Sequence, residues 1–428
     1  MLDIQLIREH PDRVRAAISS KRIGRPEVVD ELLAVDSAWR ASSTALQELK
    51  TDLNERATRI GQLMREKRLE EAESLKTVNT QVKAQIGDLE AAVRTHRDRR
   101  HALMLEVPNL PHESVPAGET PDDNVETYRT QIPDTGLEGR RPHWEILDDL
   151  SLADFERGAK VAGAGFPFYL GQGAKLHRAL INFFLDQAVI AGYTEVQAPI
   201  LVNAASATAT GQLPDKEDQM YEVTRDGLYA IPTAEVPLTN FFRDETLTEK
   251  DLPTRLCGYT PCFRREAGSY GKDVRGLNRL HQFDKVELVQ FVTPESSYDA
   301  LEEMRAHAEK LLELLELPYR RLLMCTADMG FTQTKKYDLE VWSAGQQRWL
   351  EVSSISNFEA FQSRRANIRY RAESDGKLHF LHTLNGSGLA LPRVVAAIVE
   401  NGLDAAGNVD LPESLVEYFG SERIGSAL

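Results

Sequence analysis

Residues 28–105 form a proline-free stretch that constrains the fold of this chain more than any other part of the sequence. Apolar residues recur there at alternating three- and four-residue steps, first over residues 32–63 and again over residues 75–93. This heptad spacing predicts two amphipathic helices that pack along one apolar seam. Because a short charged segment near residues 66–70 joins the two runs, we expect an antiparallel coiled-coil hairpin on the order of 50 Å long, at about 1.5 Å per residue.

The predicted arm is the least acidic large part of the chain. It holds 13 Lys and Arg residues against 13 Asp and Glu residues, whereas the whole chain of 428 residues has a net charge of -15. Its basic residues suit the phosphates of an RNA, but a solvated coiled-coil surface or a protein–protein spacer has the same pattern. The overall acidity argues against a protein that coats nucleic acid, since counterion release needs concentrated positive charge. A nucleic-acid partner would therefore bind one local patch.

Four prolines between Val107 and Asn124 mark the end of the arm. Proline restricts the backbone to extended or turn conformations, so this segment is predicted to be a stiff linker. We divide the chain into an N-terminal helical domain of residues 1–106, the linker 107–124 and a second domain of residues 125–428. The three cysteines form no CxxC pair, which argues against a disulfide framework or a zinc ribbon. Without a secretion-like start or a long apolar stretch, we expect a cytoplasmic protein with no membrane segment.

The second domain alternates strand-like runs with few helices. In its second half, consecutive strands with short turns predict a mainly antiparallel sheet with helices packed on it, which is an α+β fold. Residues 175–191 have the spacing of a buried helical face, and residues 143–160 and 295–315 are also predicted to be helical. Residues 194–202 are predicted to be one strand, which Pro199 confines to an edge or interface.

Residues 262–290 are the strongest candidate for the functional site. Period-2 alternation places Arg264, Glu266, Phe283 and Glu287 on one side of two predicted strands and apolar residues on the other. The glycine-rich, basic connection between these strands could close over a polyanion and open again. The alternative is an exposed hairpin with a solvated run of charges. The connection between the strands adds basic residues, one serine and three glycines: Gly268, Ser269, Gly271, Lys272, Arg275, Gly276 and Arg279.

Three shorter motifs carry groups suited to a small charged ligand. Thr233–Glu235 places a hydroxyl and a carboxylate on one side of an extended chain, where they suit an ammonium group. Glu351–Ser354 offers adjacent oxygen ligands for a hard cation such as Mg²⁺. Asn385–Arg393 opens a helix whose first turn tolerates Pro392 and projects Arg393. Turns, helix caps and a plain helix start are the alternatives. Because no GxGxxG or GxxxxGK[ST] motif is present, side chains on an open sheet must hold any nucleotide.

Together these stretches resemble bacterial seryl-tRNA synthetases, which are class II aminoacyl-tRNA synthetases. The similarity rests on FRREAGSYGKDVRGLNRLHQFDKVE, NLPHESVP, TAE, EVSS and NGSGLALPR, in the family's order and with the arm in place. The block from Phe263 to Glu287 is the specific part, because a string as short as TAE matches many proteins. The resemblance implies a catalytic domain on a mainly antiparallel sheet of six or seven strands. It also implies a homodimer formed through residues 175–199 and an arm that binds the long variable arm of serine tRNA.

The resemblance further implies roles for individual residues. Arg264 and Arg393 match the catalytic arginines that contact the α-phosphate and the γ-phosphate of ATP, and Glu351 and Ser354 match a pair that binds Mg²⁺. The implied ATP contacts are Arg264, Arg265, Glu266, Leu280, Phe283, Glu351, Val352, Ser353, Ser354 and Arg393. The implied serine contacts are Thr233, Ala234, Glu235, Arg264, Glu287 and Ser387.

This sequence departs from the family at two of the matched positions. Arg265 stands where the family commonly has serine, and Pro392 stands where it commonly has glycine. Arg265 alternates away from the site face, so we expect it to have little effect. Pro392 is expected to shift Arg393 slightly.

The implied activity is activation of L-serine by ATP to seryl-adenylate and pyrophosphate, followed by transfer to the 3′ end of serine tRNA. A carboxylate is already an oxyanion at neutral pH, so positioning and charge neutralisation suffice and no Ser-His-Asp or Cys-His set is needed. Two other interpretations stay open: a related ligase that loads a carrier protein, and a non-catalytic RNA-binding or scaffold protein. The sequence also leaves open which arm residues contact RNA and whether the selenocysteine tRNA is charged.

Overall fold

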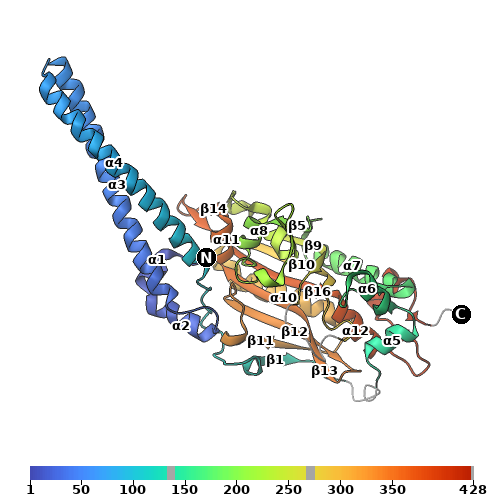
Figure 1. Ribbon diagram of the computed structural model, residues 1–428. Coiled ribbons are helices and arrows are strands. Elements are labelled where there is room, and N and C mark those ends of the chain that lie inside the picture. The colour runs from blue at the N-terminus through green and yellow to red at the C-terminus, as the bar shows by residue number, and fades with distance from the viewer. Residues whose placement is uncertain (133–139, 267–274, 426–428) are drawn as a thin grey trace. The chain divides into compact units, whose positions relative to one another are not determined.

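The computed structural model describes residues 1–132, 140–266 and 275–425 and contains two compact units (Figure 1). The first unit consists of Met1–Ser19 and Ile23–Pro108, and the second consists of Ser20–Arg22 and Asn109–Leu428. The assignment of separate roles to these parts of the chain stays a prediction. Among the described residues, no helix combines the length and the hydrophobicity that a membrane span requires.

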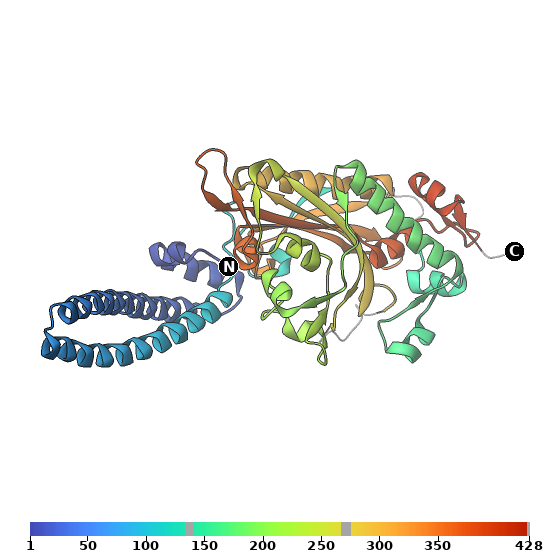
Figure 2. The same cartoon turned by 90° about the horizontal axis from the view of Figure 1, so that it is seen from above.

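The first unit is helical and is dominated by a hairpin of two long helices (Figures 1 and 2). Lys50 Nζ lies 2.8 Å from Glu90 Oε1, and Arg99 Nη2 lies 3.2 Å from Glu31 Oε2, so the two helices run antiparallel. The predicted coiled-coil arm is therefore confirmed. The helices of this unit are α1 (Ile4–Glu9), α2 (Pro11–Lys21), α3 (Val28–Arg65) and α4 (Leu69–Leu105).

A buried carboxylate joins the helices at the base of the hairpin. The Asp36 side chain is 0% exposed and accepts hydrogen bonds from Arg8 Nε at 2.8 Å and Arg40 Nε at 3.0 Å. Arg100 Nε of α4 lies 2.9 Å from its other oxygen. Burial opposes ionisation of Asp36, but these arginines outweigh it and lower the pKa of the carboxyl. One charge thus ties together α1, α3 and α4.

The second unit is built on an eight-stranded sheet with the order β1-β11-β12-β13-β16-β10-β9-β4. Neighbouring strands are antiparallel except β4 and β9, which are parallel. This confirms the predicted class of sheet, and short strands at the two edges bring it beyond the expected six or seven. The strands are β1 (Val125–Arg129), β4 (Thr194–Glu195), β9 (Thr254–Phe263), β10 (Gln282–Val292), β11 (Tyr319–Leu323), β12 (Lys335–Ser343), β13 (Arg348–Glu359) and β16 (His382–Ala390).

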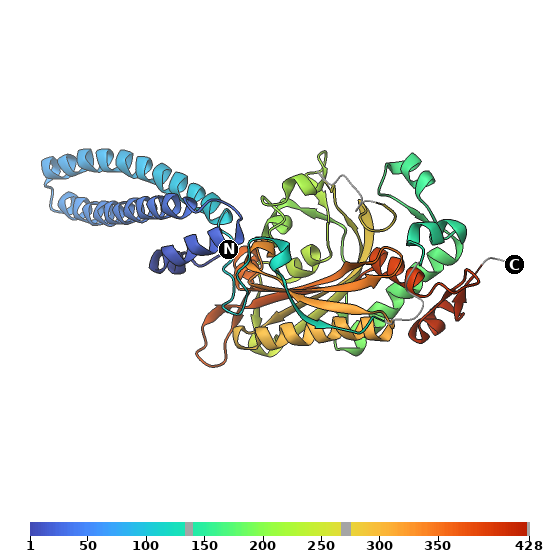
Figure 3. The same cartoon turned by 90° about the horizontal axis from the view of Figure 1, so that it is seen from below.

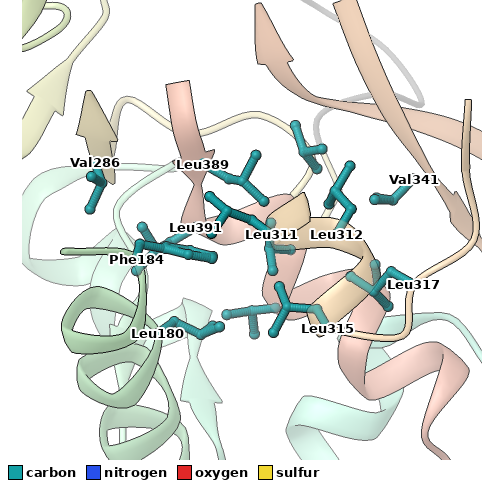
Figure 4. Packing of buried hydrophobic residues seen from close by; sticks show 14 of the residues in the cluster. Leu180, Phe184, Val286, Leu311, Leu312, Leu315, Leu317, Val341, Leu389 and Leu391 are labelled. Atoms are coloured by element: carbon teal, nitrogen blue, oxygen red, sulfur yellow. The ribbon is translucent and has the colours of Figure 1, made fainter. Parts of the chain in front are cut away.

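Helices pack on both faces of this sheet, over a large core on one face and a smaller cluster on the other. Under the first face, α7 (Gly171–Ile190), α10 (Ser297–Leu314) and α12 (Leu391–Asn401) bury the main hydrophobic core (Figure 4). On the opposite face, α8 (Ala204–Ala209), α9 (Glu235–Thr239) and α11 (Phe361–Ala366) pack over a smaller cluster (Figure 3). The uncovered part of that second face is left for polar side chains. The remaining helices are α5 (His143–Asp149), α6 (Phe155–Ala162) and α13 (Glu413–Phe419).

Two predicted elements are broken in the structure. Residues 194–202 form β4 and β5 (Leu201–Asn203), which belong to different sheets, because Pro199 between them has no N–H to donate to a ladder. Residues 143–160 form α5 and α6 with β2 between them. Four small sheets contain the other strands: β2 (Ala153–Asp154) with β3 (Phe168–Tyr169); β5, β7 (Leu228–Ala230) and β6 (Tyr221–Val223); β15 (Leu378–Phe380), β14 (Arg369–Arg371) and β8 (Thr246–Thr248); and β17 (Val409–Asp410) with β18 (Arg423–Ile424).

Candidate active site

Polar side chains line the central strands on the face opposite to α7, α10 and α12. Along β10, Val286 and Leu288 enter the main core, so alternation turns Lys285 and Glu287 to the other face. Glu287 lies opposite Ser387 across the β10–β16 pair. The strand order therefore brings together residues that are 100 positions apart in the sequence.

Lys285 connects two of the predicted serine contacts. Its ammonium donates a hydrogen bond to Thr233 Oγ1 at 2.9 Å and forms an ion pair with Glu287. All three side chains are at least 93% buried. The expectation that Thr233 and Glu235 share an extended chain is wrong, because α9 begins at Glu235 and the Glu235 backbone N–H donates to Thr233 Oγ1 at 3.2 Å. A turn of this kind is the usual local bond of a threonine hydroxyl.

Glu235 is held from a second direction by a chain of hydrogen bonds. Thr383 Oγ1 donates to Gln362 Oε1 at 2.8 Å, and Gln362 Nε2 donates to Glu235 Oε1 at 2.7 Å. Burial and the negative charge of Glu287 raise the pKa of Glu235 to about 7, while the bond from Gln362 acts in the opposite direction. A cation that binds between these two carboxylates would restore the ionised form.

Glu351 occupies the other end of the polar face. Desolvation of the half-exposed carboxyl opposes its ionisation, but the positive charges of Lys336, Arg393, Arg264 and Lys285 outweigh that effect and lower its pKa. Arg393 Nη1 donates to the Glu351 backbone carbonyl at 2.8 Å, and Arg393 Nε donates to the Asn278 carbonyl at 2.9 Å. Pro392 occupies the first turn of α12 beside Arg393, as predicted.

Oxygen ligands for a cation gather next to Glu351. Asp338 lies opposite Ser354 across the β12–β13 pair, and Lys336 Nζ lies 3.1 Å from Asp338 Oδ2. Within the described parts of the chain, the buried Asp338 Oδ1 has no hydrogen-bond partner. Burial and the negative charge of Glu351 raise the pKa of Asp338, whereas Lys336 lowers it. The net effect is a raised pKa. This all-oxygen donor set fits Mg²⁺, which uses one or two carboxylates and takes its other ligands from phosphates and water.

Arg264 follows the end of β9 and lies against an aromatic ring. Its guanidinium carbon is 5.1 Å from the centre of the Phe283 ring, and its Nε donates to the Pro232 carbonyl at 3.4 Å. Arg279 Nη1 lies 3.3 Å from Glu266 Oε2. Arg265 instead directs Nη1 to the Asp218 carbonyl at 3.3 Å. These contacts agree with the alternation that turns Arg264 and Arg265 in different directions.

Several implied contacts have side chains that do not face this site. Leu280 and Val352 are part of the main hydrophobic core, and Ala234 belongs to the smaller cluster. Ser353 is 1% exposed, and its hydroxyl donates to the Ser387 carbonyl at 2.6 Å. A ligand could reach these residues only through their backbones. The loop residues Gly268, Ser269, Gly271 and Lys272 lie outside the described residues.

The sequence reasoning missed several charged or polar residues of the site. Lys285 is two residues from both Phe283 and Glu287 on β10 and so faces the same side of the strand. The same alternation argument could therefore have found it. Lys336 and Asp338 alternate in the same way on β12. Gln362 carries no such signal, because its position beside Glu235 arises only when α11 packs near α9.

Comparisons with known proteins identify related sequences and structures. The sequence matches the family model described as seryl-tRNA synthetase N-terminal domain over residues 1–111. It matches the tRNA synthetase class II core domain (G, H, P, S and T) over residues 221–402. A protein of Salinibacter ruber named "Serine--tRNA ligase" is 57% identical over 427 residues, which cover 100% of each chain.

Two solved structures are similar over the whole chain. The crystal structure of seryl-tRNA synthetase from Pyrococcus horikoshii complexed with ATP has a TM-score of 0.93 at 35% identity, covering 100% of both chains. The cytoplasmic serine-tRNA ligase of Naegleria fowleri in complex with AMP has a TM-score of 0.87 at 27% identity, covering 100% of this chain and 99% of that one.

Proposed function

This chain belongs to the seryl-tRNA synthetase family, and on that premise we propose that it is a serine–tRNA ligase. It activates L-serine with ATP to seryl-adenylate and pyrophosphate, and it transfers the seryl group to the 3′ end of serine tRNA. The observation that carries this proposal is electrostatic: the charges of Arg264, Lys285 and Arg393 all act on the Glu351 carboxylate. Groups from β10, β13, α12 and the residue that follows β9 therefore act at one place, as a polyanionic substrate requires.

We assign the first step to positioning and charge neutralisation. The serine carboxylate attacks the α-phosphorus, pyrophosphate leaves, and no protein nucleophile takes part. Arg264 binds the attacking carboxylate and the α-phosphate, and Phe283 stacks on the adenine beside Glu266. Arg393 binds the γ-phosphate. Fixed cations of this kind stabilise the charge that develops in the transition state without reorganising during the reaction.

The serine pocket is assigned to Thr233, Glu235, Glu287 and Ser387, with Lys285 as an added member. The two carboxylates suit the serine ammonium group, and the buried polar groups suit its hydroxyl. Selection against alanine follows, because alanine would leave buried polar groups without a partner, which binding sites discriminate strongly. Selection against threonine would rest on excluding one methyl group, which gives a smaller difference.

Magnesium is assigned to Glu351 and Ser354, with Asp338 beside them. Bound there, Mg²⁺ would neutralise phosphate charge during the displacement. Glu351 and Ser354 would hold the ion, while Arg393 stays fixed by the carbonyls of Asn278 and Glu351.

The arm is assigned to binding of serine tRNA. Arg65, Lys67 and Lys83 are exposed and make no ion pair among the described residues, so their charges are available to phosphates. We further propose that the enzyme acts in the cytoplasm as a homodimer through residues 175–199. Large apolar side chains within this segment, at the end of α7, are exposed, with Val189 47% and Ile190 76% accessible. Light scattering should give a dimer mass that the variant Ile190→Lys reduces.

Amino-acid-dependent exchange of pyrophosphate into ATP tests the activity. We expect exchange with serine and little with the other amino acids. Arg264→Ala should abolish it, whereas Arg255→Ala, at the other end of β9 in an ion pair with Glu303, should retain it. Absence of exchange in the wild-type protein would refute the ligase assignment and favour a non-catalytic RNA-binding protein. Exchange without charging of serine tRNA would favour a ligase that loads a carrier protein.

A further inference from the structure

A buried histidine–carboxylate pair lies outside the residues assigned above. His143 of α5 and Glu400 of α12 are both 0% exposed, and His143 Nδ1 lies 2.8 Å from Glu400 Oε1. The same oxygen accepts the His143 backbone N–H at 2.8 Å. Glu400 Oε2 accepts the Gly345 N–H at 3.0 Å and the Ser343 hydroxyl. Burial opposes ionisation of Glu400, but these bonds lower the pKa of its carboxyl. Both oxygens of the Glu400 carboxylate therefore accept hydrogen bonds, and His143 contributes two of the donors.

The hydrogen bond at the second ring nitrogen of His143 shows which of the two nitrogens carries the proton. Nε2 accepts a hydrogen bond from the backbone N–H of Leu277 at 2.8 Å. A ring nitrogen that accepts a hydrogen bond carries no proton, so Nδ1 carries it and donates to Glu400. Glu400 thus selects the tautomer that can bind the Leu277 amide.

Residues 275–278 rest on α5 through three neighbouring contacts. Besides the Leu277 bond, the Arg275 guanidinium lies 4.7 Å from the centre of the Trp144 ring. Gly276 has a φ of 65°, and a Cβ atom there would lie 2.3 Å from His143 Nε2. Glycine is required at this position for both reasons, and the backbone can lie directly on the histidine ring.

The same short segment holds Arg393. The Asn278 carbonyl accepts Arg393 Nε at 2.9 Å, and Asn278 Nδ2 donates to Gln346 Oε1 at 2.9 Å. Gln346 Nε2 in turn lies 3.3 Å from Glu400 Oε1. The network therefore begins and ends at Glu400, and Leu277 and Asn278 lie between His143 and the guanidinium.

We propose that His143 is a positioning residue for ATP: in the tautomer selected by Glu400, it anchors residues 276–278 and thereby orients Arg393. This inference rests on the proposed function, because it takes Arg393 as the group that binds the γ-phosphate. His143 itself touches no substrate. Its removal should weaken ATP binding, whereas the serine pocket around Thr233 and Glu235 should be unaffected.

The test compares two substitutions of His143 in the full-length protein by serine-dependent pyrophosphate exchange. His143→Ala should raise the KM for ATP about tenfold and change the KM for serine by less than about twofold. His143→Gln should restore the KM for ATP to within about threefold of wild type, because a glutamine amide supplies one donor and one acceptor. His307→Ala, on α10 against Tyr193, is the control for loss of a largely buried histidine and should leave both KM values unchanged.

Amide hydrogen exchange at Leu277 provides a measurement that is independent of activity. His143→Ala should increase the exchange rate at Leu277 at least about tenfold, and His143→Gln should keep it protected. The inference would be overturned by an equal rise in the KM for ATP in both variants, by an unchanged KM for ATP in His143→Ala, or by an unchanged exchange rate at Leu277 in His143→Ala. A wild-type protein without serine-dependent exchange would refute the proposed function and with it the ATP role of His143. The anchoring of residues 276–278 would then be judged by hydrogen exchange alone.

Discussion

Arg393 contacts Glu351 in two ways. Its Nη1 donates to the Glu351 backbone carbonyl at 2.8 Å and lies 3.9 Å from Glu351 Oε2. The arginine belongs to the first turn of α12 and the glutamate to β13, and 42 positions separate them. The guanidinium is thus held by protein groups beside the carboxylate assigned to Mg²⁺.

This arrangement predicts that Arg393 cannot be replaced by lysine. Lysine keeps the charge, but a single ammonium cannot reproduce the planar fork that donates to both the Asn278 and Glu351 carbonyls. We expect Arg393→Lys to lower kcat/KM for ATP in pyrophosphate exchange about 100-fold. Arg305→Lys, which changes an ion-paired arginine on α10, is the matched control. A similar small effect of both substitutions would contradict the role given to Arg393.

The carboxylate of Glu351 should determine the magnesium requirement. Glu351→Gln removes one charged ligand, so the Mg²⁺ concentration for half-maximal exchange should rise at least about tenfold. Glu340→Gln provides the comparison, because Glu340 lies opposite Glu351 across the strands but bonds to Arg320. A titration in which the two variants respond alike would show that Glu351 has no special part in binding the ion.

The raised pKa of Glu235 predicts a pH dependence of serine binding. Burial and Glu287 raise this pKa to about 7, and the serine ammonium group favours the ionised carboxylate. The KM for serine should therefore fall as pH rises from 6 to 8, by up to about tenfold per pH unit below 7.

The same pKa shift affects the stability of the protein. In the unfolded chain the Glu235 carboxyl loses its proton at about pH 4.3, whereas in the folded protein it does so at about pH 7. The Glu235 contribution to stability therefore decreases as pH rises through that range.

Gln362 should shift this pH dependence. Its hydrogen bond lowers the pKa of Glu235, so Gln362→Met should move the inflection in the serine KM to higher pH. Gln290→Met is the control, since Gln290 is an equally buried glutamine that donates to Tyr193. If the inflection stays in place in Gln362→Met, the titrating group is not Glu235.

Deleting the arm should separate the two steps of the reaction. Arg25 of the first unit lies 3.3 Å from Glu106, so the ends of the hairpin are close enough for a short glycine–serine linker to replace residues 28–105. The shortened protein should keep pyrophosphate exchange and lose charging of serine tRNA, because the proposed phosphate contacts are on the arm. Circular dichroism would establish that the rest is folded. Loss of exchange in a folded deletion protein would contradict this division of labour.

The predictions from sequence succeeded where a local period was sufficient. The heptad spacing predicted α3 and α4, and alternation along β9 and β10 predicted which side Arg264 and Glu287 take. Predictions failed where the chain turns and the alternation ends. Thr233 and Glu235 were predicted to share one side of an extended chain, but they form a turn and the start of a short helix. Pro199 was predicted to confine one strand to an edge or interface, and β4 and β5 do lie at sheet edges, but they belong to two different sheets.

By itself, the sequence determined the class of fold, the arm and the motifs that resemble the seryl-tRNA synthetase family. These features depend on repeats and short motifs whose residues lie within a few positions of one another in the sequence. Only the tertiary structure decided that Gln362 holds Glu235 and that His143 and Glu400 hold Leu277. Such contacts join residues more than 100 positions apart, and they exist because the packing of separate helices and strands places a donor beside an acceptor.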